Sequence, residues 1–318
     1  MSEVSLKNVS LKGKKITVLY GGTSSEREIS LISGKAVIEA LHELNADVQV
    51  IDVNEHFITK QLPDIKGEQV FIALHGGDGE NGRIQAILDM AKISYTGSGM
   101  AASSIAMSKL RTKQVWLAEK LSTPHYEVLS PASTWADVAK SLGQKVIIKP
   151  ASEGSSIGMS IASDENSFNQ ARTVAFQYDQ HVIAEQWISG EEYTVAILGD
   201  RALPAIRLKT DKAFYDFEAK YKSSTTQYIC PCGLSAADEK ALQDLSLRAF
   251  RAVGCKSWGR VDVMRSVGGT KDKGTFYLLE VNTVPGMTDH SLVPMAAKAD
   301  GMDFKTLVFN ILNVGGDR

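Results

Sequence analysis

Cysteine is scarce in this chain, and its few copies are poorly placed for metal or redox chemistry. The 318 residues include three cysteines, which are Cys230, Cys232 and Cys255. The first two stand in the order Cys-Pro-Cys, which lacks the two-residue spacing of zinc-binding and redox pairs. No cluster of cysteines and histidines accompanies them. We therefore interpret all three as structural or incidental.

Long apolar runs and an excess of one charge are also absent. No stretch reaches the roughly 18 apolar residues of a membrane span, and the N-terminal MSEVSLKNVSLKGKK lacks the apolar core of a secretion signal. The net charge of −2 leaves no electrostatic footprint for nucleic acid or an anionic membrane. We expect a cytoplasmic protein that binds neither and that holds any anion in a local site.

The first third of the chain alternates short apolar strands with helices. The strand in KITVLYGG ends in glycines, and a helix follows in which Ser25 and Glu28 have the spacing of a capping box. VQVIDV and QVFIAL predict further strands, and NGRIQAILDMA predicts another helix. Short apolar strands between helices predict a doubly wound parallel sheet that is covered on both faces.

The rest of the chain follows a different pattern. A strand in QKVIIKP, a glycine- and serine-rich loop, a returning strand in MSIA, a helix and a strand in HVIAEQWI predict a small α+β unit from about 109 to 192. Beyond it lie a long polar segment, 211–228, a helix between Ser235 and Gly254, and strands in WGRVDVM and TFYLLEVN. A polar segment of that length in a compact protein is usually functional or disordered.

Two of these strands carry polar side chains where apolar ones are expected. Residues two apart share one face of a strand, so Arg260 lies beside Asp262, and Glu280 lies beside Asn282. If the strands pair, two carboxylates, an amide and a guanidinium converge. This oxygen-rich set suits Mg²⁺, which keeps several waters and takes other ligands from phosphate. The alternative is an ordinary solvated strand face, which the flanking apolar runs disfavour.

A metal site of this kind calls for a phosphate-binding element. Lys149 ends a strand, and Gly154, Ser155 and Gly158 follow it in the segment IIKPASEGSSIGMS. Glycines allow backbone N–H groups to approach phosphate oxygens, and the lysine adds positive charge. The segment is not a Walker A loop, because the terminal GK[ST] is missing. A glycine-rich hairpin turn explains it about as well.

Three other features are ambiguous. Gly97, Gly99 and Ala102 have a G-x-G-x-x-A spacing, but they lie at the end of the first third of the chain and not in an opening βαβ unit, which argues against a dinucleotide site. His75 lies beside a glycine cluster at a strand end, either as a ligand-binding residue or as an ordinary loop histidine. Glu26, in the first turn of the capped helix, either favours the helix dipole or binds an ammonium group.

Taken together, these segments resemble the ATP-grasp enzymes, and within them the D-alanine–D-alanine ligases. The resemblance covers essentially the whole chain, from GGTSSEREISL and ALHGGDGENG through IIKPASEGSSIGMS and EQWISGEEYTVAIL to GCKSWGRVDVM and LLEVNTVPGMTDHSLVPMAA. It implies an N-terminal α/β domain on the first D-alanine side, 1–108, a central ATP-grasp unit, 109–192, and a C-terminal ATP-grasp domain, 193–318, which carries the metal site and a lid loop, 211–228.

The resemblance also implies roles for individual residues. ATP is expected between the central and C-terminal units, bound by Lys109, Lys149, Glu185, Gln186, Ile188 and Glu192. Two Mg²⁺ ions, for which Mn²⁺ could substitute, are expected on Asp262, Glu280 and Asn282. The expected catalytic residues are Glu26, Ser155, Lys220, Tyr221 and Arg260, and the expected substrate-binding residues are His75, Gly286, Ser291 and Leu292.

The implied reaction joins two D-alanine molecules through an acyl phosphate, giving D-alanyl-D-alanine, ADP and phosphate for peptidoglycan. A tyrosine at the position of Tyr221 is similar to the dipeptide-forming members of the family, whereas members that use lactate tend to carry phenylalanine there. Gln186 departs from the lysine that is common there, which puts ATP affinity in doubt. The family also suggests a homodimer. Two alternatives are another ATP-grasp carboxylate–amine ligase, in which Glu26, Tyr221 and Ser291 need not be present, and a nucleotide-binding module without catalysis, in which a metal ligand or Arg260 would be missing.

Overall fold

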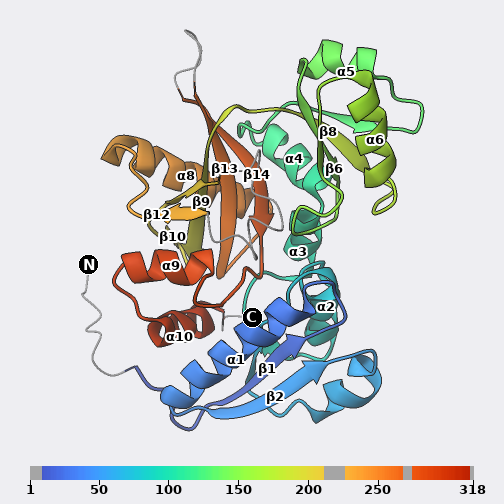
Figure 1. Cartoon of the computed structure of the whole chain (residues 1–318). Helices are drawn as coiled ribbons and strands as arrows, with labels where there is room; N and C mark the ends of the chain where they lie inside the picture. Colours follow the sequence, from blue (N-terminus) through green and yellow to red (C-terminus); the bar gives the residue numbers. More distant parts are fainter. Residues whose placement is uncertain (1–8, 211–225, 268–273, 316–318) are drawn as a thin grey trace.

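The structure is a computed structural model of the whole chain, and it describes residues 9–210, 226–267 and 274–315. Three sheets follow one another along the chain, each with its own helices (Figure 1). Of the described helices, none combines the length and the apolar character that crossing a membrane requires.

The first sheet is parallel, as the sequence predicts. Its strands are β1 (Lys15–Gly21), β2 (Asp47–Val53), β3 (Gln69–Ile72) and β4 (Ser94–Tyr95), in the order β2-β1-β3-β4. The connections include α1 (Arg27–Glu43), α2 (Arg83–Met90) and the short turns η1 (Phe57–Gln61), η2 (Leu62–Asp64) and η3 (Gly77–Gly79). Val18 and Leu19 point to opposite faces, and both are fully buried, so both faces of the sheet are covered.

The predicted capping box of the first helix is wrong. Helix α1 begins at Arg27, its N-cap is Glu26, and no side chain caps it. Ser24 instead accepts a hydrogen bond from the Glu26 N–H at 3.1 Å and donates one to the carbonyl of His75 at 2.6 Å. The start of α1 is therefore attached to the end of β3 and not closed on itself. This leaves Glu26 at the helix end, where it faces the site described below.

The second sheet is antiparallel and forms the small α+β unit that the sequence predicts. Its strands are β5 (Tyr126–Leu129), β6 (Val146–Pro150), β7 (Ser160–Ala162) and β8 (Val182–Gln186), in the order β5-β8-β6-β7. Helices α5 (Trp135–Leu142) and α6 (Glu165–Ala175) pack on it around the buried Phe168. Helices α3 (Met100–Met107) and α4 (Lys109–Ala118) connect this unit to the first sheet (Figure 1).

The third sheet is also antiparallel and has the order β12-β11-β9-β13-β14, with β10 paired to β9. The strands are β9 (Gly190–Leu198), β10 (Arg201–Ala202), β11 (Ile206–Lys209), β12 (Gln227–Ile229), β13 (Trp258–Ser266) and β14 (Phe276–Asn282). Helix α8 (Ala236–Ala252) covers one face; Ser235 caps it as predicted, and Gly254 follows its end with φ +79°. Strand β9 runs through position 192, where the sequence predicts a domain boundary.

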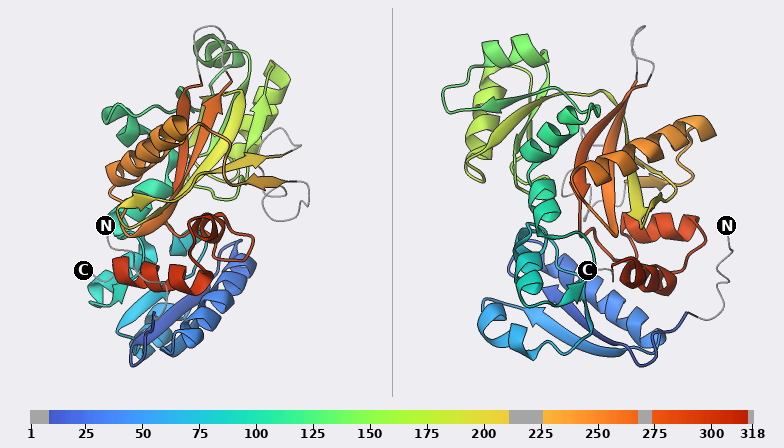
Figure 2. Two further views of the ribbon diagram at one scale, coloured as in Figure 1. Left: turned by 90° about the vertical axis from the view of Figure 1, so that its left-hand side faces the viewer. Right: turned by 180° about the vertical axis from the view of Figure 1, so that it is seen from behind.

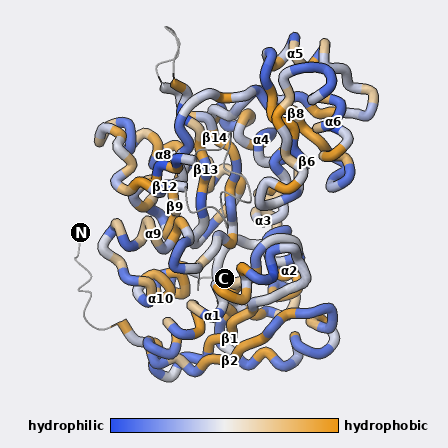
Figure 3. Tube along the Cα trace, in the orientation of Figure 1, coloured by the Kyte–Doolittle hydropathy of each residue, from blue (hydrophilic) through white to orange (hydrophobic). Residues whose placement is uncertain are grey.

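The chain then returns to the first sheet. Helix α10 (Phe304–Val314) packs against α1, and α9 (Leu292–Ala299) packs against α10 and β9 (Figure 2). One hydrophobic core contains Leu41 of α1, Phe71 of β3 and Ile311 of α10, and α10 is among the most hydrophobic parts of the trace (Figure 3). The end of the chain therefore belongs to the same core as its beginning, and the segment after β14 joins the first and third sheets.

Candidate active site

Strands β13 and β14 bring the predicted metal ligands together. They pair antiparallel with Asp262 opposite Glu280 and Arg260 opposite Asn282, so all four side chains share one face of the sheet. The pairing shifts register immediately after Asp262. The two strands therefore pair, which from the sequence alone could only be assumed.

Asp262 is the centre of this group. Its carboxylate accepts two hydrogen bonds from Arg260, at 2.9 and 2.8 Å, and one from Thr194 at 2.6 Å. The amide nitrogen of Asn282 donates to it at 3.1 Å. Such a bidentate pair fixes the plane of the carboxylate and also fixes the guanidinium, which is mostly buried.

The donor chemistry of this face fits Mg²⁺. Among residues 9–210, 226–267 and 274–315, no cluster of three or more His, Cys, Asp or Glu side chains is placed to hold a metal ion. Asp262, Glu280 and Asn282 supply two carboxylates and one amide carbonyl, which leaves most of the shell to water and phosphate oxygens. This is how Mg²⁺ is usually held at nucleotide sites, whereas a fully enclosed protein cage is uncommon for it.

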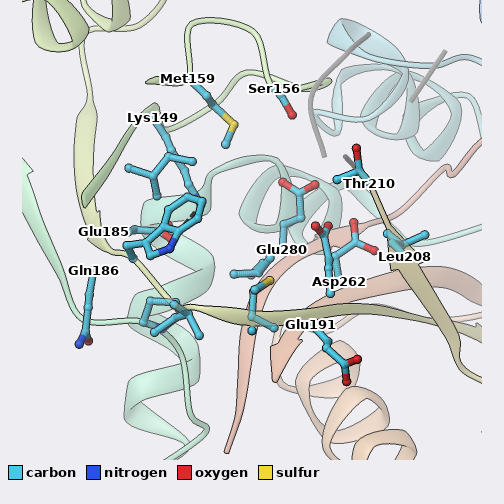
Figure 4. A pocket seen from close by; sticks show the side chains of 18 of the residues that line it. Lys149, Ser156, Met159, Glu185, Gln186, Glu191, Leu208, Thr210, Asp262 and Glu280 are labelled. Atoms are coloured by element: carbon cyan, nitrogen blue, oxygen red, sulfur yellow. Dashed lines mark hydrogen bonds and ion pairs between the residues drawn. The ribbon is translucent and has the colours of Figure 1, made fainter. Parts of the chain in front are cut away.

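A cavity of about 480 Å³ lies between the second and third sheets, next to this group (Figure 4). Asp262 and Glu280 stand close together in it, and Gln186 lies at its edge (Figure 4). All six residues predicted to bind ATP line it, namely Lys109, Lys149, Glu185, Gln186, Ile188 and Glu192. The cavity has the size of a small-molecule site.

One wall of this first cavity contains a buried ionic cluster. Glu185, 1% exposed, lies 2.8 Å from Lys149 and 3.3 Å from Lys113. Burial alone would raise the pKa of Glu185, but the two lysines outweigh it and hold that pKa below its usual value. Burial lowers the pKa of Lys113 to about 8, although Glu185 opposes this.

Sequence reasoning missed Lys113. It lies four residues after Lys109 and therefore on the same face of α4. It is completely buried and donates to the hydroxyl of Thr123 at 2.6 Å. That hydroxyl donates to the carbonyl of Leu278 in β14 at 2.8 Å, so a chain of polar contacts connects the wall of the cavity to the strand that carries Glu280. The spacing of the two lysines was the available signal.

A second cavity, of about 300 Å³, opens on the other side of Glu280. It is lined by the remaining predicted residues within the described part of the chain, apart from Asp262, namely Glu26, His75, Ser155, Arg260, Asn282, Gly286, Ser291 and Leu292. Lys109 and Glu280 line both cavities and lie 3.3 Å apart. This pair is therefore the junction between the two cavities. The predicted Lys220 and Tyr221, and most of the segment 211–228, lie outside the described residues.

The glycine-rich loop after β6 reaches this second cavity. Ser155 donates to Glu26 at 2.7 Å, which joins residues that are 129 positions apart in the chain. Ser155 and Ser156 both have positive φ, +50° and +61°, a conformation that is uncommon for residues other than glycine. Such backbone is held only where the surroundings impose it, and it concentrates at functional sites. The loop connects β6 to the antiparallel β7, as the hairpin interpretation also requires.

Two carboxylates face each other in the second cavity. Glu80 accepts a hydrogen bond from the Gly76 N–H at 3.0 Å. Burial is the main cause that raises the pKa of Glu80 to about 8, and the nearby Glu26 adds to it. Sequence reasoning missed Glu80, although it stands in the glycine cluster beside His75. Perturbed carboxyl groups of this kind are typical of functional sites.

His75 and Ser291 are bonded to protein groups. His75 is 3% exposed, and its two ring nitrogens lie 2.9 Å from the Val284 carbonyl and 2.8 Å from the Ser33 hydroxyl. Burial lowers the pKa of His75 to about 4. Ser291 accepts a hydrogen bond from the Thr288 N–H at 2.9 Å and packs so closely on Gly286 that a Cβ there would lie 2.7 Å from its oxygen. A side chain at Gly286 would therefore displace Ser291.

Comparison with known proteins identifies the family. The family description "D-ala D-ala ligase N-terminus" matches residues 15–67 and 58–98, and "D-ala D-ala ligase C-terminus" matches residues 115–313. The D-alanine–D-alanine ligase of Saccharophagus degradans is 54% identical over 295 residues, which are 93% of this chain and 92% of the relative. The chain belongs to the D-alanine–D-alanine ligase family. A ligase of the same name from Alcanivorax borkumensis is 52% identical, over 94% of this chain and 92% of the relative.

Solved structures of this family have the same fold. The D-alanine–D-alanine ligase of Bacillus anthracis in complex with ATP superimposes with a TM-score of 0.82 at 30% identity, over 95% of this chain and 97% of that one. The VanG D-Ala:D-Ser ligase of Enterococcus faecalis gives a TM-score of 0.81 at 26% identity, over 95% and 99% of the two chains. The predicted fold class is thereby confirmed, and so is the predicted relationship to ATP-grasp ligases.

Proposed function

We propose that this protein joins two D-alanine molecules at the expense of ATP, giving D-alanyl-D-alanine, ADP and phosphate. The observation that carries the proposal is the junction of the two cavities at Lys109 and Glu280. The first cavity offers lysines and a metal-binding face to a nucleotide. The second offers carboxylates and Arg260 to an amino acid. Two substrates in these cavities would meet at the shared pair.

The first step activates a carboxylate, which is a poor electrophile. A carboxylate oxygen of the first D-alanine attacks the γ-phosphorus of ATP, the bond to the β-γ bridging oxygen breaks, and ADP leaves. We assign Lys109 and Lys149, which line the first cavity, to the phosphates. Bound Mg²⁺, as two ions or with Mn²⁺ substituting, would be held by Asp262, Glu280 and Asn282 and would offset the charge of the transferring phosphoryl group.

The second step forms the amide. The amine of the second D-alanine attacks the carbonyl carbon of the acyl phosphate, the amine loses a proton, and phosphate leaves with the former carboxylate oxygen. Arg260 and the Gly286 N–H are the proposed donors to the oxyanion that develops in the tetrahedral intermediate. Glu26 and Ser155, already hydrogen bonded, are proposed to act with Tyr221 at the first D-alanine. Ser291 and Leu292 are proposed to receive the carboxylate of the second D-alanine, and Lys220 is assigned with Tyr221 to the lid loop.

The remaining assignments complete the proposal. Glu185, Gln186 and Ile188 lie along the wall that we assign to adenine, and Glu192 is assigned to the ribose. The backbone N–H of Gln186 donates to the carbonyl of His125 at 2.9 Å, and this contact does not depend on the side chain. Glutamine in place of the common lysine therefore changes only the side chain at the edge of the cavity. We further propose a homodimer and, because ATP is supplied in the cytoplasm, a reaction that takes place there.

Phosphate release from ATP and Mg²⁺ tests the proposal, with D-alanine, L-alanine, D-alanine plus D-lactate, and D-alanine plus D-serine as separate substrates. We expect release with D-alanine alone, with the dipeptide as product, and none with L-alanine. The D-serine arm is included because one structural relative is a D-Ala:D-Ser ligase. No phosphate release with D-alanine, together with release with another amino acid, would assign the chain to a different carboxylate–amine ligase activity. Nucleotide binding without any release would favour a non-catalytic module.

A further inference from the structure

The loop 284–287, which contains Gly286, is held by a buried hydrogen-bonded chain. The Met287 N–H donates to the hydroxyl of Ser33 at 3.1 Å, and that hydroxyl lies 2.8 Å from Nε2 of His75. Nδ1 of His75 lies 2.9 Å from the carbonyl of Val284. These four residues are at most 3% exposed, so water does not replace these contacts. The two ends of the loop are thus tied to α1 and to the end of β3.

The chain of contacts has one consistent assignment of hydrogens. The Val284 carbonyl only accepts, so Nδ1 of His75 carries a proton and donates it. The Met287 N–H only donates, so the Ser33 oxygen accepts it, and the Ser33 hydroxyl donates to Nε2. This assignment holds for a neutral imidazole, which is the form that burial of the ring favours at neutral pH. Each group in the chain is then satisfied.

Ser33 differs from an ordinary buried helical serine. Ser246 of α8 is equally buried, and its hydroxyl donates to the carbonyl of Leu242, four residues earlier in its own helix at 2.8 Å. Ser33 instead contacts residues that are 42 and 254 positions away in the chain. Its hydroxyl therefore holds other segments in place and does not serve its own helix.

We propose that Ser33 and His75 are positioning residues, which set the Gly286 N–H at the place where the oxyanion forms. The inference rests on the proposed function, in which Gly286 is one of two oxyanion donors. A donor of this kind stabilises only charge that develops in the tetrahedral intermediate, so its displacement slows amide formation more than it weakens ATP binding. His75 thereby acts through the loop, which differs from the direct substrate contact that the sequence suggested.

Ser33→Ala tests this against a matched control, Ser30→Ala. Ser30 lies one turn earlier in α1, is equally buried, and donates to the Ala73 carbonyl at 2.7 Å, without contacting loop 284–287. Both variants lose one buried hydroxyl. Rapid-quench measurement of ADP and dipeptide from the full chain, with ATP, Mg²⁺ and D-alanine, separates the two chemical steps. Urea unfolding and the KM for ATP are measured alongside.

We expect Ser33→Ala to form dipeptide roughly ten- to a hundredfold more slowly than wild type, with a burst of ADP ahead of dipeptide and an unchanged KM for ATP. Ser30→Ala should unfold at the same urea concentration as Ser33→Ala but should show no burst of ADP. His75→Asn retains a donor toward Val284 and should slow amide formation in the same direction, and the double variant Ser33→Ala/His75→Asn should be no slower than the slower single variant.

The outcomes separate the inference from the proposed function. A wild-type protein that makes no ADP or dipeptide from D-alanine refutes the function itself. An active wild type, together with a folded Ser33→Ala variant that behaves as Ser30→Ala does, overturns the positioning role alone. If Ser33→Ala does not fold, His75→Asn decides, because normal amide formation in that variant contradicts the inference.

Discussion

The two cavities differ in how they handle buried charge. On the wall of the first cavity, Glu185 is matched by Lys113 and Lys149, so the carboxylate stays ionised. In the second, Glu26 and Glu80 face each other, and the pKa of Glu80 rises to about 8 mainly because it is buried. The buried carboxylate of the first wall is thus stabilised by cations of the protein itself. The buried carboxyl group of the second cavity is instead neutral at pH 7.

The largest effect is expected when the buried carboxylate in the wall of the first cavity is removed. Glu185→Gln leaves two buried ammonium groups without a counter-charge, and we expect a loss of about 3–5 kcal/mol in the free energy of unfolding. Urea unfolding measures it. Glu191→Gln on the neighbouring β9 is the control, because that carboxylate is 40% exposed and its pair with Arg207 should contribute less than about 1 kcal/mol. Equal losses in the two variants would contradict the account.

The second largest effect is expected at the strand face to which we assign Mg²⁺. Asp262→Asn removes a charge that we assign both to Mg²⁺ and to the orientation of Arg260, and we expect dipeptide formation to fall roughly 100- to 1000-fold. The Mg²⁺ concentration that gives half-maximal rate should rise. Asp244→Asn, at an exposed ion pair with Lys240 on α8, should change neither quantity. Normal Mg²⁺ dependence in Asp262→Asn would remove this residue from the metal site.

The proton on Glu80 should appear as a pH dependence of stability. With a pKa near 8, Glu80 holds its proton in the folded state, whereas the unfolded chain loses it above about pH 4.5. Stability therefore falls as pH rises from about 4.5 to about 8. His75, with a folded pKa near 4 and an unfolded value of 6.5, opposes this fall below about pH 6.5, so the effect of Glu80 is clearest between pH 6.5 and 8.

Glu80→Gln should abolish this dependence, since the amide retains an acceptor for the Gly76 N–H but does not titrate. The variant should gain about 2 kcal/mol relative to wild type between pH 6.5 and 8, at about 1.4 kcal/mol per pH unit. Urea unfolding at several pH values measures the difference. Parallel curves for variant and wild type would show that Glu80 is ionised in the folded protein.

The smallest expected effect concerns the polar contacts between the first cavity and β14. Thr123→Val keeps the shape of the side chain but removes a hydroxyl that serves both Lys113 and Leu278, and we expect a loss of about 1 kcal/mol in unfolding free energy. Thr173→Val, which removes an exposed hydroxyl of α6 bonded within its own helix, should cost much less. A neutral Thr123→Val would mean that Glu185 alone satisfies Lys113.

The sequence predicted features that depend on local periodicity. The alternation along β13 and β14 placed Arg260, Asp262, Glu280 and Asn282 on one face, and the structure confirms their pairing. The parallel first sheet, the α+β unit and the cap at Ser235 follow from similarly local patterns. Family resemblance then gathered the remaining site residues, and each one within the described chain lines one of the two cavities.

Features that depend on tertiary packing were not predictable in this way. The spacing of Ser25 and Glu28 fits a capping box, but Ser24 bonds to the end of β3 and the helix begins at Arg27. In the sequence, Lys113 looks like an ordinary polar residue on the surface of a helix. Its burial against Glu185 depends on the tertiary fold. The contact of Ser33 with Met287 joins residues 254 positions apart, and no local pattern specifies it.

The most direct test follows one oxygen atom. D-Alanine labelled with ¹⁸O in its carboxylate is incubated with the protein, ATP and Mg²⁺, and the products are analysed by mass spectrometry. We expect the released phosphate to carry one ¹⁸O from D-alanine, because the carboxylate oxygen attacks the γ-phosphorus at the junction of the two cavities and leaves with phosphate. Label in AMP, with pyrophosphate as co-product, would mean that the carboxylate attacks the α-phosphorus and would contradict the proposed acyl phosphate.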